Sequence, residues 1–222
     1  MRKVAILGGT FDPVHWGHLL MAQTALSQVA LEQVIWVPAR CPPHKLAAKF
    51  EHRWEMVQRA IAEHPAFVIS PLAENHSGPT YAIQTLIEFQ AFYPNTHWYW
   101  IVGLDTFQTL PRWYRRLELA SACDWLVVPR MRAGDRGQGA GGRGQGAGEA
   151  GGDYEALCQQ VAQQLGEQGV GVRWRLLQMP LVGVSSSLIR QYCRDRTSIR
   201  YLVPEAVRIY ITTYNLYLDG TG

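Results

Sequence analysis

The sequence predicts an α/β fold built on a doubly wound parallel sheet, and two observations support this prediction. Short apolar runs, typical of buried strands, alternate along the chain with longer segments whose apolar residues recur at helical spacing. A glycine-rich turn, Gly8-Gly9, follows the first of these runs directly. Such alternation is typical of βαβ units, in which helices cover both faces of a parallel sheet.

The individual elements follow from these runs and spacings. Strands are predicted over Val4–Leu7, Val34–Pro38, Phe67–Ser70, His97–Val102, Trp125–Pro129 and Arg173–Gln178. Helices are predicted over His18–Ala30, Glu51–Glu63, Tyr81–Phe92 and Tyr154–Gln168. After Pro204, which suits a first helical turn, residues at helical intervals predict a further helix that docks on the domain (Val207, Tyr210, Ile211, Tyr214, Tyr217 and Leu218). The expected architecture is a Rossmann-like doubly wound parallel sheet with a C-terminal helical segment.

Composition limits the classes of function. A chain of 222 residues with 47% hydrophobic residues suits a single globular domain, and a net charge of +3 is too small to indicate a nucleic-acid partner. The four cysteines form no Cys-x-x-Cys pair, so neither a zinc site nor a disulfide framework is indicated. The sequence shows neither a secretory signal nor an apolar stretch of membrane-spanning length. We therefore expect a cytoplasmic protein without a membrane partner; a homo-oligomer is compatible with the sequence.

One segment breaks the alternation of strands and helices. Residues Ala133 to Gly152 contain Gly-Gln-Gly-Ala-Gly twice and no large apolar side chain. Such a segment buries too little surface to offset its ordering entropy, so we expect a disordered insertion within the single domain 1–222. An arginine–glycine segment that binds RNA is the functional alternative, but it holds only Arg136 and Arg143 and no aromatic residue.

The most informative motif follows the first strand. It reads Gly8-Gly9-Thr10-Phe11-Asp12-Pro13-Val14-His15-Trp16-Gly17-His18. Strand, glycine turn and helix start form a phosphate-binding arrangement, because glycine permits close approach of the backbone and a helix N-terminus offers N–H groups. Since His15 and His18 are three residues apart at a helix start, we expect both imidazoles to face the same phosphates.

This motif resembles the signature of the nucleotidylyltransferase superfamily and, within it, of the nicotinate mononucleotide adenylyltransferases. The resemblance implies that Gly8, Gly9, Thr10 and Phe11 bind ATP and that His15 and His18 are catalytic. Taken together, the matching segments extend from Ile6 to Tyr217 and omit only the glycine-rich insertion.

A second motif, Val184-Ser185-Ser186-Ser187-Leu188-Ile189-Arg190, resembles the family's Ile-Ser-Ser-Thr-x-Ile-Arg. Hydroxyl groups at a helix start cap the helix and donate to phosphate oxygens, and Arg190 follows one turn later. Alone, this pattern would indicate an ordinary N-cap with a surface arginine. Beside the first motif, it implies that Ser185 and Ser186 bind ATP and that Arg190 is catalytic.

Three further matches imply the rest of the site. Pro42-Pro43-His44-Lys45 follows the second strand, and the resemblance places His44 and Lys45 near the mononucleotide phosphate. A helix start at Thr80-Tyr81-Ala82 offers N–H groups to a carboxylate, although Ala82 stands where the family has threonine. The fourth strand ends in Gly103-Leu104-Asp105, which implies that Gly103 and Asp105 bind ATP, with Asp105 on a ribose hydroxyl. Trp113 would stack on the pyridine ring, with Tyr114 beside it.

The resemblance implies transfer of AMP from ATP to nicotinate mononucleotide by direct in-line attack, which gives deamido-NAD and pyrophosphate. Magnesium (Mg2+) would accompany the ATP, with few protein ligands. A pantetheine-phosphate adenylyltransferase shares the His-x-Gly-His chemistry, but a shorter chain without Pro-Pro-His-Lys would be expected. A class I tRNA synthetase would need several hundred more residues. A nucleotide-binding regulator without catalysis is the alternative of another class; it would need the glycine loop but neither histidine.

Overall fold

The computed structural model describes residues 1–41, 47–70, 81–129, 150–180 and 182–218. In this part of the chain the sheet has six strands in the order β3-β2-β1-β4-β5-β6, and every neighbouring pair is parallel. The strands are β1 (Arg2–Gly9), β2 (Gln33–Pro38), β3 (Phe67–Ile69), β4 (Thr96–Gly103), β5 (Asp124–Val128) and β6 (Trp174–Leu176). All six predicted strands are confirmed, with ends that differ by at most two residues.

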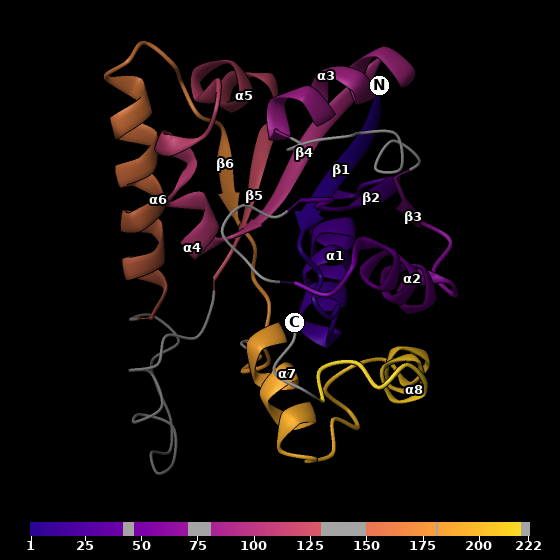
Figure 1. Ribbon diagram of the computed structural model, residues 1–222. Helices are drawn as coiled ribbons and strands as arrows, with labels where there is room; N and C mark the ends of the chain where they lie inside the picture. Colours follow the sequence, from indigo (N-terminus) through magenta and orange to yellow (C-terminus); the bar gives the residue numbers. More distant parts are fainter. Residues whose placement is uncertain (42–46, 71–80, 130–149, 181, 219–222) are drawn as a thin grey trace.

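Helices cover both faces of this sheet (Figure 1). Successive residues of β1 point to opposite faces: Ala5 and Leu7 belong to one apolar core, and Val4 and Ile6 to the other. The first core packs against α1 (Trp16–Val29), α2 (Phe50–Ile61), α7 (Ser186–Arg194) and α8 (Glu205–Thr213). The second packs against α3 (Ala82–Phe92), α4 (Leu104–Phe107), α5 (Arg116–Ala122) and α6 (Ala150–Gly166). The doubly wound prediction is therefore confirmed.

The strand order places a topological switch point between β1 and β4. From β1 the chain proceeds outward to β2 and β3, and from β4 it proceeds in the opposite direction to β5 and β6. Loops that leave the carboxyl ends of β1 and β4 therefore diverge, and ligands of doubly wound sheets bind in the crevice that this divergence creates.

Several features differ from the prediction. The predicted turn at Gly8-Gly9 is wrong, because both glycines end β1 and pair with β2. Helix α6 begins at Ala150, inside the predicted glycine-rich insertion, of which residues 133–149 lie outside the described part of the chain. The short helices α4 and α5 and the 3₁₀ helix η2 (Leu110–Arg112) carry too few apolar residues for a periodic signal. The C-terminal helix α8 ends at Thr213, so Tyr217 and Leu218 lie beyond it despite their helical spacing. In the described residues, no helix is both long enough and apolar enough to cross a membrane.

Candidate active site

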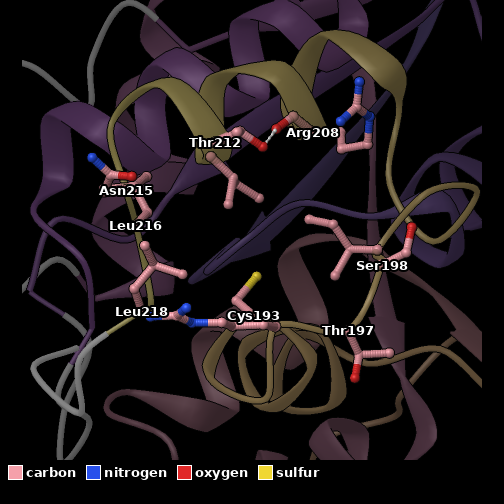
Figure 2. Close-up of a pocket in the computed structure, with 11 residues that line it drawn as sticks. Cys193, Thr197, Ser198, Arg208, Thr212, Asn215, Leu216 and Leu218 are labelled. Carbon is pink, nitrogen blue, oxygen red and sulfur yellow. Dashed lines mark hydrogen bonds between the residues drawn. The ribbon is translucent and has the colours of Figure 1, made fainter.

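A cleft of about 610 Å³ lies at the carboxyl ends of β1 and β4, at the switch point. A second cavity, about 350 Å³, lies between α7 and the segment around α8 (Figure 2). Its lining includes Arg208, which is already paired with Glu205 at 2.5 Å. Residues of the Gly8–His18 motif, of the Gly103–Asp105 segment and of the Val184–Arg190 motif line the first cleft, and none of them lines the second, so the first is the candidate active site.

Close packing explains the glycines of the first motif. Phe11 has a left-handed backbone with φ of 51°, which brings its ring under Gly9. A Cβ on Gly9 would lie 3.0 Å from two carbons of this ring, and a Cβ on Gly17 would lie 3.0 Å from the His15 ring. Larger residues at either position would displace the loop that forms the floor of the cleft.

His15 and His18 lie one behind the other, with ring centroids 3.8 Å apart and nearly parallel planes. His18 lines the cleft, whereas His15 is only 2% exposed and is absent from the lining. His15 is the N-cap residue of α1, and its ring lies behind that of His18. Of the two imidazoles, His18 is therefore the one that faces the cleft, and contact of both rings with the phosphates stays a prediction. The His15 backbone N–H donates to His18 Nδ1 at 3.3 Å, so Nδ1 is an acceptor and Nε2 carries the hydrogen of the neutral ring.

Helix α7 brings the second motif to the same loop. Ser185 is its N-cap, and the side-chain oxygen accepts from the Leu188 N–H at 3.2 Å, as predicted. Ser186 donates its hydroxyl hydrogen to the Pro13 carbonyl at 2.9 Å. That hydroxyl therefore joins the two motifs to each other, and its donation to phosphate stays a prediction. The N–H groups of the first turn of α7 remain suited to an anion.

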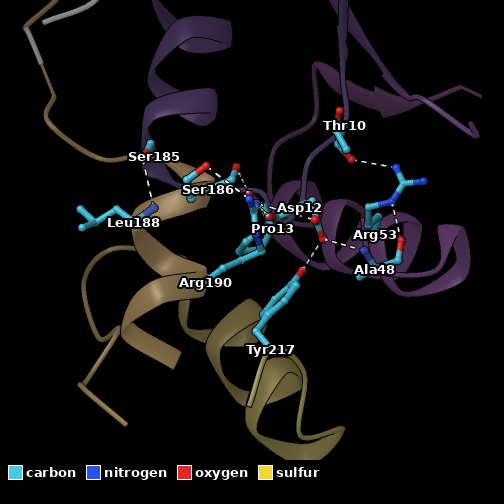
Figure 3. Close-up of polar contacts among 11 residues, drawn as sticks. Thr10, Asp12, Pro13, Ala48, Arg53, Ser185, Ser186, Leu188, Arg190 and Tyr217 are labelled. Carbon is cyan, nitrogen blue, oxygen red and sulfur yellow. Dashed lines mark hydrogen bonds and ion pairs between the residues drawn. The ribbon is translucent and has the colours of Figure 1, made fainter. Parts of the chain in front are cut away.

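Arg190 and Asp12 form the charged centre of this junction (Figure 3). The Arg190 Nη1 donates to the Asp12 carbonyl at 2.6 Å and lies 3.7 Å from the carboxylate oxygen Oδ2. Asp12 Oδ1 accepts from the Ala48 N–H at 3.3 Å and from the Tyr217 hydroxyl at 2.8 Å. The Arg190 side chain lines the cleft and is 26% exposed. Asp12 therefore fixes the guanidinium on one side, while its other side remains accessible to a ligand in the cleft.

Arg53, on α2, stabilises the loops next to the cleft by hydrogen bonds to their backbone carbonyls. It is 1% exposed, and its guanidinium donates to four carbonyl oxygens at distances of 2.7 to 3.1 Å. Burial lowers the pKa of Arg53, and the charge of Asp12 opposes this shift; an arginine keeps its charge in such a setting. The four acceptors are the carbonyls of Thr10, Ala39, Arg40 and Ala48.

The residues predicted to bind ATP all line this cleft: Gly8, Gly9, Thr10, Phe11, Gly103, Asp105, Ser185 and Ser186. Trp113 lines it as well, with its indole N–H donating to Thr109 Oγ1 at 2.9 Å. Tyr81, Ala82 and Tyr114 are not part of the lining; the rings of Tyr81 and Tyr114 contact each other at 4.5 Å and are about half exposed. His44, Lys45 and Thr80 lie outside the described residues.

Sequence reasoning missed three polar residues of this site. Asp12 is inside the first motif, but nothing in the pattern assigns it a role. Arg53 occupies the apolar face of α2, one turn before Met56 and Val57, and a charge on such a face is a usable signal. Tyr217 gives no signal, because its partner is 205 positions away in the sequence.

Comparison with known proteins adds independent findings. A cytidylyltransferase-like family model matches residues 6–192. A protein of Trichormus variabilis named probable nicotinate-nucleotide adenylyltransferase is 54% identical over 221 residues, which cover 100% of both chains. A Geobacillus kaustophilus protein of the same name is 35% identical over 225 residues, covering 100% of this chain and 89% of the other.

Solved structures agree at the level of the fold. Plasmodium falciparum nicotinic acid mononucleotide adenylyltransferase, complexed with NaAD, aligns with a TM-score of 0.73 over 98% of each chain. The same protein complexed with APC aligns with a TM-score of 0.71. At 19% sequence identity, these likenesses establish a shared architecture.

Proposed function

Because this chain belongs to the nicotinate-nucleotide adenylyltransferases, within the cytidylyltransferase-like family, we propose that the cleft at the switch point transfers the adenylyl group of ATP to nicotinate mononucleotide. The products are deamido-NAD and pyrophosphate, a step of NAD biosynthesis. The observation that supports the proposal is that His18, Arg190 and the start of α7 all meet in one cleft, beside Gly8 and Gly9 at the end of β1. These groups suit a polyphosphate with a developing negative charge.

The chemistry needs no activated nucleophile from the protein. The attacking oxygen belongs to the mononucleotide phosphate and is already anionic, so the bond to the α-phosphorus forms as the bond to pyrophosphate breaks. Catalysis then consists of alignment and of stabilising charge on the phosphate oxygens. We assign this stabilisation to His18 Nε2, Arg190 and the first-turn N–H groups of α7. His15, buried behind His18, acts as a positioning residue that fixes the His18 ring.

The other end of the cleft suits the two nucleosides. Asp105 and Trp113 both line it, which supports a ribose contact for the carboxylate and a stacking face for the pyridine ring. Tyr81 and Tyr114 lie outside the present lining, so their contact with the nicotinate carboxylate is proposed from the family resemblance. The same holds for Ala82 and for His44, Lys45 and Thr80.

A divalent metal accompanies the nucleotide in enzymes of this kind, and we propose Mg²⁺. In the described cleft the carboxylates are those of Asp12 and Asp105, and Asp12 is already held by Tyr217 and Ala48. This donor set fits an ion whose ligands are mainly ATP phosphate oxygens and water, with Asp105 as the available protein carboxylate. When bound, such an ion would neutralise part of the negative charge of the ATP phosphates.

The cytoplasm is the compartment that we propose. All four cysteines are free thiols, three of them buried, which suits a reducing compartment. The proposed partners are the two nucleotide substrates, in line with solved neighbours complexed with NaAD and APC.

The carboxylate of the acceptor gives the first test. We expect kcat/KM to favour nicotinate mononucleotide over nicotinamide mononucleotide at least ~10-fold, because backbone N–H donors that pair with an anion are left facing an NH₂ group. Steady-state pyrophosphate release with each acceptor measures the ratio. Trp113→Ala should weaken both acceptors alike, since it removes only the stacking face.

Equal efficiency with the two acceptors would contradict the carboxylate assignment and leave adenylyl transfer intact. Trp54→Ala, on the outer part of α2 and absent from the cleft lining, is the matched control for loss of an indole.

A further inference from the structure

The hydrogen bond between Tyr217 and Asp12 joins the C-terminal segment to the first motif. Tyr217 is 6% exposed, and its hydroxyl donates to Asp12 Oδ1 at 2.8 Å (Figure 3). The neighbouring residues Leu216 and Leu218 line the second cavity (Figure 2). The tyrosine ring is therefore the part of this segment that reaches the active-site loop.

The backbone at Tyr217 has an unfavourable conformation, which indicates that the contact with Asp12 is maintained at an energetic cost. Tyr217 has a φ of 68°, in the left-handed region that a bulky residue rarely adopts. Helix α8 ends at Thr213, four residues earlier, although the apolar spacing would allow it to continue. The chain thus leaves helical geometry and accepts a costly conformation at the residue whose hydroxyl meets Asp12.

The two oxygens of Asp12 have separate partners. Oδ1 accepts from the Tyr217 hydroxyl and from the Ala48 N–H, whereas Oδ2 lies 3.7 Å from Arg190 Nη1. Two donors on Oδ1 fix the rotation of the carboxyl group, and this fixed rotation presents Oδ2 to the guanidinium. Without the hydroxyl, Oδ1 retains the longer of its two hydrogen bonds and the carboxyl group can turn.

The hydroxyl remains a donor throughout the working pH range. Burial raises the pKa of Tyr217, and the nearby charge of Asp12 raises it further. The charged groups near it include Asp12 on the first loop, Arg190 on α7 and Arg53 on α2, and Arg190 only partly opposes the shift.

We propose that Tyr217 is a positioning residue for adenylyl transfer: its hydroxyl fixes the Asp12 carboxylate, and Asp12 holds the Arg190 guanidinium at the phosphates. This inference rests on the proposed function. It assigns a part in the reaction to a residue that lines no part of the cleft.

Tyr217→Phe tests the inference, with Tyr210→Phe as its matched control. Both tyrosines are buried near the C-terminus and both hydroxyls bond one side chain, but the partner of Tyr210 is His52, at 3.0 Å. Tyr217→Phe should lower kcat about tenfold, with KM for ATP within about twofold, because misalignment at the phosphates acts mainly in the transition state. Tyr210→Phe should leave kcat within about twofold at a similar melting temperature.

A second experiment tests whether the effect of Tyr217 depends on Arg190. In an Arg190→Ala background, which no longer has the guanidinium to position, Tyr217→Phe should change kcat by less than about twofold. An equal loss in both backgrounds, or a parental kcat for Tyr217→Phe, would overturn the inference. If Tyr217→Phe does not fold, Asp12→Asn is compared in the same two backgrounds, and the same equality would count against it. A parent enzyme without turnover would contradict the proposed function, which the other outcomes leave standing.

Discussion

His18→Ala is expected to lower kcat by about 10²- to 10³-fold while it weakens ATP binding far less. The reason is the position of the ring. The His15 backbone N–H occupies Nδ1, so His18 presents a fixed Nε2 donor in the cleft, and a fixed donor stabilises charge that grows in the transition state. Single-turnover rates at saturating ATP, with a separate equilibrium measurement of ATP binding, separate the two effects.

Two further variants make this test specific. His18→Gln keeps an N–H donor near the position of Nε2 and should recover part of the rate. His97→Ala removes an imidazole that pairs with Asp124 at the first residue of β5, away from the cleft, and should leave kcat within about twofold. A His18→Ala enzyme that turns over within threefold of the parent would remove His18 from the mechanism.

Arg53→Met should destabilise the fold by about 3 kcal/mol or more, which lowers the melting temperature by about 10 °C. Methionine replaces the aliphatic part of the side chain but leaves the carbonyls of Thr10, Ala39 and Ala48 without their buried donor. Since Thr10 belongs to the floor of the cleft, kcat/KM should fall with stability. Thermal denaturation followed by circular dichroism gives the first quantity, and pyrophosphate release gives the second.

Arg59→Met is the matched control on the same helix. Arg59 is 45% exposed, pairs with Glu55 four residues earlier and packs over the Tyr210 ring, and these two interactions together are worth about 1 kcal/mol. If Arg53→Met melts within about 2 °C of Arg59→Met, Arg53 does not stabilise the three loops as we propose.

The sheet was predictable because its central strands are buried on both faces. Such strands read as uninterrupted apolar runs, as Val4–Leu7 does, and Gly8 and Gly9 at the end of β1 lead directly into the first motif. The ATP-binding residues were predictable for a related reason: they follow strand ends or open helices, and a parallel sheet brings those ends to one edge.

The polar support of the site was not predictable from local pattern. Helical spacing continues through Tyr217, but a tertiary contact with Asp12 overrides it after Thr213. Likewise, the sequence does not show which of His15 and His18 is buried and which faces the cleft. Their spacing of three residues is the same in both cases, and the start of α1 determines which ring enters the core. Contacts of this kind join segments far apart in sequence, so only the folded chain reveals them.

Transfer of a label from the α-phosphorus of ATP tests the central claim most directly. With ³²P at that position, Mg²⁺ and nicotinate mononucleotide, we expect the label in deamido-NAD, with one pyrophosphate released for each dinucleotide formed. The same reaction with phosphopantetheine in place of the mononucleotide should give no labelled product. Label that stays in ATP with nicotinate mononucleotide, or that moves to phosphopantetheine instead, would contradict the assignment.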